Sequence, residues 1–179
     1  MDVSFERTGE RGYATVVTLP GRAPRRMDPA PGYDDDIPHD LVHYLVEAEL
    51  GLANAVYGRA LAGGGSFRET EEAPGDRRRR ARAQRRLNKR EAALRRGDHA
   101  DMATSEYFAG VCDIAWRRKA GARPPEWAER RRIPDEDIAK VGRVVDRLDA
   151  IAPLWRAVPV GGSLTFTWPR TTANPEPAR

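Results

Sequence analysis

The chain has 179 residues, which fits one domain large enough to bury a core. Its 31 basic and 27 acidic residues leave a net charge of only +4, and its single cysteine excludes a disulfide framework or a cysteine-based zinc site within the chain. No apolar run reaches the roughly 18–20 residues of a membrane span, and the first residues do not resemble a signal peptide. We therefore expect a soluble cytoplasmic protein with no membrane partner.

Two β-rich runs open the chain. Residues 3–7 and 13–19 are rich in valine, threonine and aromatic residues, and Gly9 and Gly12 between them permit a tight reversal. This pattern predicts a hairpin. We expect residues 20–32 to form an irregular loop, because prolines and glycines interrupt any regular structure there.

The next stretch predicts a helix that carries two of the three histidines. Asp36 is a good N-cap, and Pro38 then falls in the first turn, where its missing N–H has no partner to lose. Side chains four residues apart lie on one helix face with Cβ atoms roughly 5–6 Å apart, so His39 and His43 are placed to bind one metal ion. The spacing is that of His-Glu-x-x-His enzymes, with Asp40 in place of the glutamate.

We therefore predict a divalent metal site, zinc before other metals, with His39 and His43 as ligands. Asp40 is a third ligand, an orienting group behind the ligands, or a general base. A coordination position open to water would make the site hydrolytic, although the motif alone names no reaction. A further ligand must come from elsewhere, because Glu47 lies roughly 12 Å along the helix axis from His39. In the alternative interpretation, both histidines are structural residues at the border of the apolar face.

The end of this helix leaves two alternatives. Glu49 projects onto the middle of the apolar face, so either the helix ends near Ala48, as Gly51 permits, or Glu49 is a partly buried acid. Residues 52–62 predict a second short helix, which the glycine run at residues 63–65 stops.

Residues 77–97 are the most biased segment and predict a strongly basic helix. Clustered arginines bind phosphate backbones, so this segment is a candidate surface for nucleic acid or another anionic partner. The second function considered is accordingly an arginine-rich nucleic-acid or protein interaction module without catalysis. A solvated helix is the simpler explanation, because no aromatic residue is interleaved to stack on bases. The basic residues are Arg77, Arg78, Arg79, Arg80, Arg82, Arg85, Arg86, Lys89, Arg90, Arg95 and Arg96.

Residues 101–118 predict an amphipathic helix that follows His99, which we expect to be an exposed loop residue. Glu106 and Asp113 lie seven residues apart on the polar face and are expected to face solvent. If this face instead meets the two histidines, either carboxylate is the first to test as the missing metal ligand.

The last part of the chain predicts a connector, a helix and a strand. Residues 121–134 are rich in proline and arginine, residues 135–155 keep helical spacing, and residues 163–168 alternate polar and apolar side chains as a half-buried strand does. We therefore predict an α+β fold in which the N-terminal hairpin and the C-terminal strand form a small antiparallel sheet packed against several helices. Residues 1–170 would form a single domain, and residues 171–179 a disordered tail.

The sequence resembles that of uncharacterised small proteins of actinobacterial type. The resemblance is carried by residues 38–43, 51–52 and 56–58. This resemblance spans most of the chain and implies no particular activity. The near absence of lysine beside abundant arginine, alanine and glycine is likewise typical of a GC-rich bacterial genome, so the arginine count by itself is weak evidence for nucleic-acid binding.

More locally, His39 and Asp40, followed after two intervening residues by His43, are similar to the zinc-binding motif of the coenzyme Q biosynthesis scaffold family. In that family a glutamate follows after eleven residues, and the corresponding position here is Ala55. The resemblance therefore implies only His39, Asp40 and His43 as zinc-binding candidates.

Overall fold

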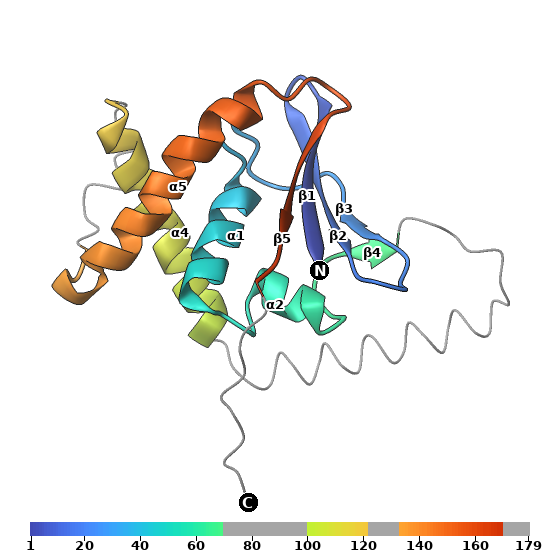
Figure 1. The fold of residues 1–179 in the computed structure, drawn as a ribbon, viewed down its shortest axis with the longest axis horizontal. Helices are drawn as coiled ribbons and strands as arrows, with labels where there is room; N and C mark the ends of the chain where they lie inside the picture. Colours follow the sequence, from blue (N-terminus) through green and yellow to red (C-terminus); the bar gives the residue numbers. More distant parts are fainter. Residues whose placement is uncertain (70–99, 122–132, 170–179) are drawn as a thin grey trace, which may run out of the picture.

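The computed structural model describes residues 1–69, 100–121 and 133–169. Within these residues, a five-stranded antiparallel sheet packs against four helices (Figure 1), which confirms the predicted α+β fold. No helix in this described part of the chain is long and apolar enough to cross a membrane.

Several features predicted from the sequence lie outside the described residues. They are the basic segment at residues 77–97 with its anionic partner, His99, and the tail at residues 171–179. Most of the predicted connector at residues 121–134 lies outside them as well.

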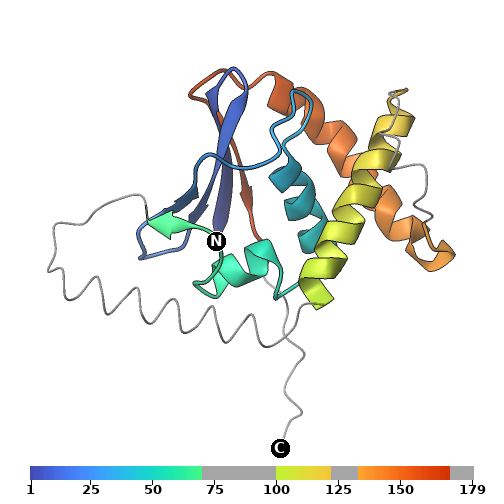
Figure 2. The same cartoon turned by 180° about the vertical axis from the view of Figure 1, so that it is seen from behind.

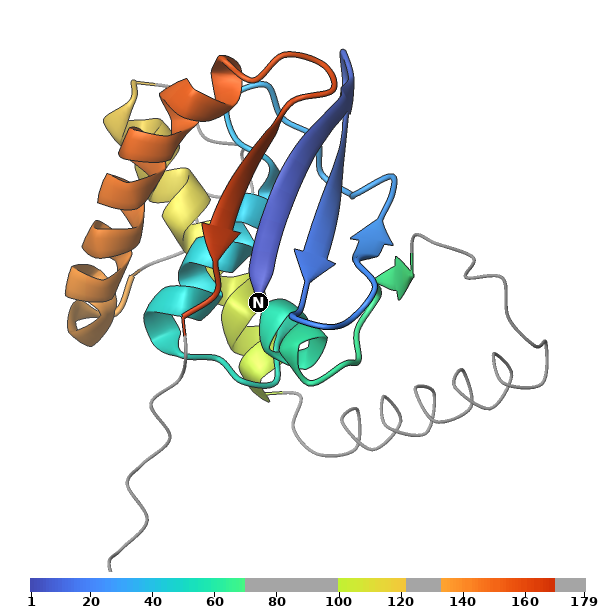
Figure 3. The same cartoon turned by 45° about the vertical axis from the view of Figure 1, so that its right-hand side comes forward.

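The sheet has the strand order β4-β3-β2-β1-β5. Strands β1 (Asp2–Gly9) and β2 (Gly12–Thr18) form the predicted hairpin, and β5 (Ser163–Thr167) pairs antiparallel with β1 on its other side. The two ends of the described chain therefore pair with each other, and β5 forms one edge of the sheet, as Figure 3 shows.

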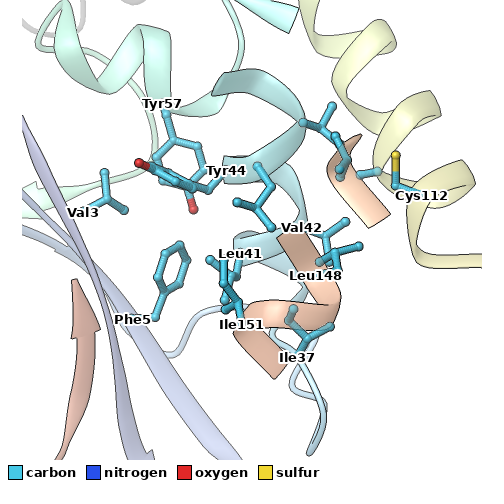
Figure 4. Close-up of a cluster of buried hydrophobic side chains, with 14 of the residues drawn as sticks. Val3, Phe5, Ile37, Leu41, Val42, Tyr44, Tyr57, Cys112, Leu148 and Ile151 are labelled. Carbon is cyan, nitrogen blue, oxygen red and sulfur yellow. The ribbon is translucent and has the colours of Figure 1, made fainter. Parts of the chain in front are cut away.

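One face of the sheet is apolar. Val3 lies opposite Phe166, and Phe5 lies opposite Leu164, so the two strands direct these side chains to the same face. Figure 4 shows Val3 and Phe5 pointing into the core, toward the side chains of the helices.

The loop expected at residues 20–32 contains a strand, so that prediction was wrong in part. Strand β3 (Arg25–Met27) pairs with β2, and β4 (Arg68–Glu69) extends the sheet beyond it. Prolines stop at Pro24 and resume at Pro29, so the three residues of β3 keep the N–H groups that a ladder requires. The buried guanidinium of Arg25 donates hydrogen bonds to carbonyls at the end of α2 and fixes this strand to the helical layer.

Helix α1 is the central helix of the fold. It lies between the sheet on one side and α4 and α5 on the other (Figure 3). Its residues 41–47 are all buried, so every polar side chain in this stretch needs a partner within the protein. The four helices are α1 (His39–Leu50), α2 (Val56–Leu61), α4 (Ala100–Lys119) and α5 (Ile138–Arg156).

The start of α1 differs from the prediction. The N-cap position is Pro38, and Asp36 lies before the helix. The carboxylate of Asp34 accepts hydrogen bonds from the main-chain N–H groups of Asp36 and Ile37, at 2.8 and 3.2 Å. Pro38 has an extended backbone, with ψ 140°, so the first helical residue is His39.

Helix α1 continues past Ala48 to Leu50, and Glu49 is partly buried, as the second alternative predicted. Glu49 forms an ion pair with Arg143 of α5, whereas Glu47 has no exposed surface. The sequence did not predict the burial of Glu47, because the helical projection assumed one apolar face, whereas residues 40–47 are all buried. The helix ends at Gly51, which takes the left-handed conformation at φ 66°.

Candidate functional site

Helices α1 and α4 lie side by side (Figure 2). His43 of α1 contacts Ser105 of α4, and only 3% of its surface is exposed. Its Nδ1 is 2.7 Å from the hydroxyl oxygen of Ser105, and that hydroxyl donates to the carboxylate of Glu47 at 2.8 Å. A serine hydroxyl has one proton, so Ser105 must accept from His43 if it donates to Glu47. When Glu47 is ionised, His43 therefore carries its proton on Nδ1, and Nε2 presents a lone pair.

The Nε2 atom of His43 faces a carboxylate that lies at the surface. It lies 3.7 Å from Oε2 of Glu106, whose side chain is 62% exposed. The ring of His39, which is also exposed, meets that of His43 edge-on with 4.6 Å between ring centres. Burial and the neighbouring His39 lower the pKa of His43 to about 4, so its imidazole is neutral at pH 7.

The side chains of His39, His43 and Glu106 do not form a complete set of metal ligands in their observed positions. Among the described residues, no group of three or more histidine, cysteine, aspartate or glutamate side chains is arranged to hold a metal ion. His39, His43 and Glu106 nevertheless come together from two helices, and the predicted histidine pair is the part of this cluster that the sequence revealed.

Ser105 connects His43 to Glu47 by hydrogen bonds and does not act as a nucleophile. It has no exposed surface, so no substrate reaches its hydroxyl. In a catalytic triad the histidine stands between the serine and the acid, whereas here the serine stands between His43 and Glu47. The chain of hydrogen bonds therefore fixes the orientation and tautomer of His43.

Glu47 has a second role at the start of α2. Its two carboxylate oxygens accept hydrogen bonds from the N–H groups of Val56 and Tyr57, at 3.1 and 2.8 Å. Burial raises the pKa of Glu47 to about 7 in spite of these donors and that of Ser105. The N-cap residue Ala55 has no side-chain acceptor, which is the one sequence signal that an acceptor comes from elsewhere. This capping also explains why α2 begins at Val56 and not at residue 52.

Asp40, the third predicted site residue, faces the sheet. Thr15 of β2 donates its hydroxyl proton to the carboxylate of Asp40 at 3.0 Å, and both residues are buried. Burial raises the pKa of Asp40 to about 6, although the Thr15 hydrogen bond and the charge of His39 oppose this rise. The fold thus places the Asp40 carboxylate behind the histidines, where it interacts with His39 and Glu106 through charge.

Two further residues complete the surroundings of the site. A Cβ atom on Gly32 would lie 2.6 Å from the Cβ of His39, and Gly32 has φ 71°, so only glycine fits beside the histidine. Asp113, the other predicted carboxylate, forms an ion pair with Arg117 at 3.0 Å, and Arg117 also contacts Asp34. Asp113 therefore takes part in a salt-bridge network with Arg117 and Asp34.

No protein-family model, curated protein or solved structure matches this chain. The function is consequently inferred from the residues of the site alone. Sequence reasoning identified His39, His43 and Asp40, and it named Glu106 as a carboxylate to test. It missed Ser105 and the buried role of Glu47, because both depend on the contact between α1 and α4.

Proposed function

We propose that the protein binds a divalent metal ion, zinc fitting best, through His39 and His43. The supporting observation is the state of His43. Its imidazole is neutral, and its Nδ1 is hydrogen-bonded to Ser105. Its Nε2 lies 3.7 Å from a carboxylate oxygen of Glu106, and its ring lies beside that of His39. Histidines that bind metal typically donate their other ring N–H to such a partner, which fixes the ring for coordination.

Hydrolysis is the chemistry we propose for this site. The exposed side chains of His39 and Glu106 leave room for water at the metal, and bound zinc lowers the pKa of a water ligand to about 7. Asp40 is the proposed general base. Its support is a pKa of about 6, close to that needed to exchange a proton near neutral pH.

We expect zinc to be present at near-stoichiometric amounts in protein purified without a histidine tag, and to be lost from His39→Ala and His43→Asn. His39 is exposed, so its loss leaves the fold intact. Asparagine at position 43 retains a donor for Ser105 but lacks Nε2. Elemental analysis measures the metal, and the melting temperature of the wild type should rise on zinc addition, because a ligand at 100 times its Kd adds about 2.7 kcal/mol.

The control for this experiment is His99→Ala, which removes the third histidine by the same substitution and should leave the zinc content unchanged. Equal trace metal in all four proteins, with a melting temperature that does not respond to zinc, would refute the proposed metal site.

The hydrolytic part of the proposal has its own test. Zinc-loaded Asp40→Asn should keep its metal, yet hydrolyse an activated ester such as p-nitrophenyl acetate about a hundredfold more slowly than the wild type, within the range for loss of a general base. An unchanged rate would remove Asp40 from the mechanism, and no zinc-dependent rate in the wild type would leave metal binding without hydrolysis.

A further inference from the structure

We propose that Glu106 of α4 is the third ligand of the metal, so that the ion bridges α1 and α4. This inference rests on the metal function proposed above. Glu106 lies 63 residues beyond His43 in the sequence, yet its carboxylate lies beside the free nitrogen of that ring, with Oε2 3.7 Å from Nε2.

The first argument is chemical. The hydrogen bond to Ser105 leaves Nε2 of His43 without a proton, so a lone pair faces a carboxylate oxygen. Two acceptors that face each other need a cation or a hydrogen-bond donor such as water between them. A metal ion satisfies both groups.

The second argument is the spacing. Zinc binds nitrogen at about 2.0–2.1 Å and carboxylate oxygen at about 2.0–2.2 Å, so two ligand atoms at a tetrahedral angle lie roughly 3.3–3.5 Å apart. The separation of 3.7 Å between Nε2 and Oε2 is close to this value and longer than a typical N–H···O hydrogen bond of about 2.9–3.0 Å. Two imidazoles on one zinc have ring centres roughly 5 Å apart by the same geometry. The rings of His39 and His43 are 4.6 Å apart.

Closing the set requires side-chain rotations. The side chains of His39 and Glu106 are exposed, and their rotation would bring all three groups onto one ion. Two histidines and a glutamate with water in the fourth position are a ligand set of hydrolytic zinc sites.

Ser105 acts beside Glu106 as a positioning residue. The two are consecutive on α4, so the same turn of helix supplies a metal ligand at the surface and the group that holds the tautomer of His43 beneath it. Glu47 supports Ser105 from behind by accepting its proton.

The test measures zinc affinity by calorimetry on the full chain. Glu106→Gln should bind zinc about 100-fold or more weakly, because losing a ligand costs more than the 10–100-fold typical of an outer partner. The matched control is Glu136→Gln, an exposed glutamate that undergoes the same loss of charge and should retain wild-type affinity. Equal affinity of Glu106→Gln and the wild type overturns the third ligand and leaves the histidine site standing. No zinc binding by the wild type overturns both.

The positioning role is tested without metal as well as with it. Nitrogen-15 shifts of His43 in the metal-free protein should show a protonated Nδ1 and a bare Nε2, and this preference should be lost in Ser105→Ala. Zinc affinity of Ser105→Ala should fall 10–100-fold and recover in Ser105→Thr, which restores a hydroxyl. Ser4→Ala, which removes a hydroxyl bonded to Thr165 on the outer face of the sheet, is the control. A protonated Nε2 in the wild type would refute this arrangement of the site.

Discussion

Relative to Glu47→Gln, the wild-type protein is expected to lose about 3 kcal/mol of unfolding free energy as the pH rises from 4 to 8. Burial raises the pKa of Glu47 from its model-compound value of 4.5 to about 7 in the folded state. The folded protein therefore holds this proton more tightly than the unfolded chain. Its contribution to stability is complete below pH 4.5 and is lost as the pH rises to about 7.

Glutamine serves as the reference because it has nearly the same shape and does not titrate. Its single amide oxygen cannot accept all three hydrogen bonds from Ser105, Val56 and Tyr57, so Glu47→Gln carries a destabilisation of its own. That penalty does not depend on pH, whereas the difference between the two proteins does. Other titrating groups, such as Asp40 and His43, are common to both proteins and cancel to a first approximation.

Urea unfolding of both proteins at several pH values measures this difference. Glu136→Gln controls for the loss of a negative charge at an exposed position and should give a difference from the wild type that changes little with pH. If the difference for Glu47→Gln stays constant between pH 4 and 8, the carboxylate is ionised throughout, and its three donors outweigh the effect of burial.

The sheet shows which parts of the fold can be predicted from local sequence. The hairpin was predicted from its β-branched and aromatic residues and the glycines between its strands, and β5 from the alternation of polar and apolar residues along it. Strand β3 was missed because nothing within Arg25–Met27 is typical of a strand. It forms because β2 offers it an edge and because the Arg25 side chain is anchored at the end of α2.

The candidate site was likewise predictable only where it depends on local sequence. The spacing of His39 and His43 is a local property of one helix, so the sequence was sufficient to predict it. Ser105 contacts His43 across 62 positions of the sequence, and that contact exists only because α4 lies beside α1. Glu106 was expected to face solvent, and its side chain is indeed 62% exposed, but at the rim next to His43. Exposure is predictable from helical periodicity, whereas the neighbouring element is not.

Deletion of residues 163–168 is expected to abolish the cooperative thermal unfolding transition. The segment contributes β5 and Trp168, which is only 5% exposed and stacks on Tyr57 with ring centres 5.6 Å apart. Fully burying one large apolar side chain contributes about 1.5–3 kcal/mol, so losing Trp168 with the half-buried Leu164 and Phe166 removes about 5 kcal/mol or more. Small domains have only about 5–15 kcal/mol of stability in total.

The deletion has a second effect, because it also uncovers residues that stay in the protein. Phe5 on β1 loses its edge contact with Phe166, and β1 becomes an edge strand with unpaired main-chain groups. Circular dichroism during heating measures the transition. The control replaces Thr165, an exposed residue of the same strand, with alanine, which keeps the apolar face and should retain a cooperative transition. A cooperative transition at the wild-type temperature after the deletion would mean that the core closes without β5, contrary to the position of β1 between two strands.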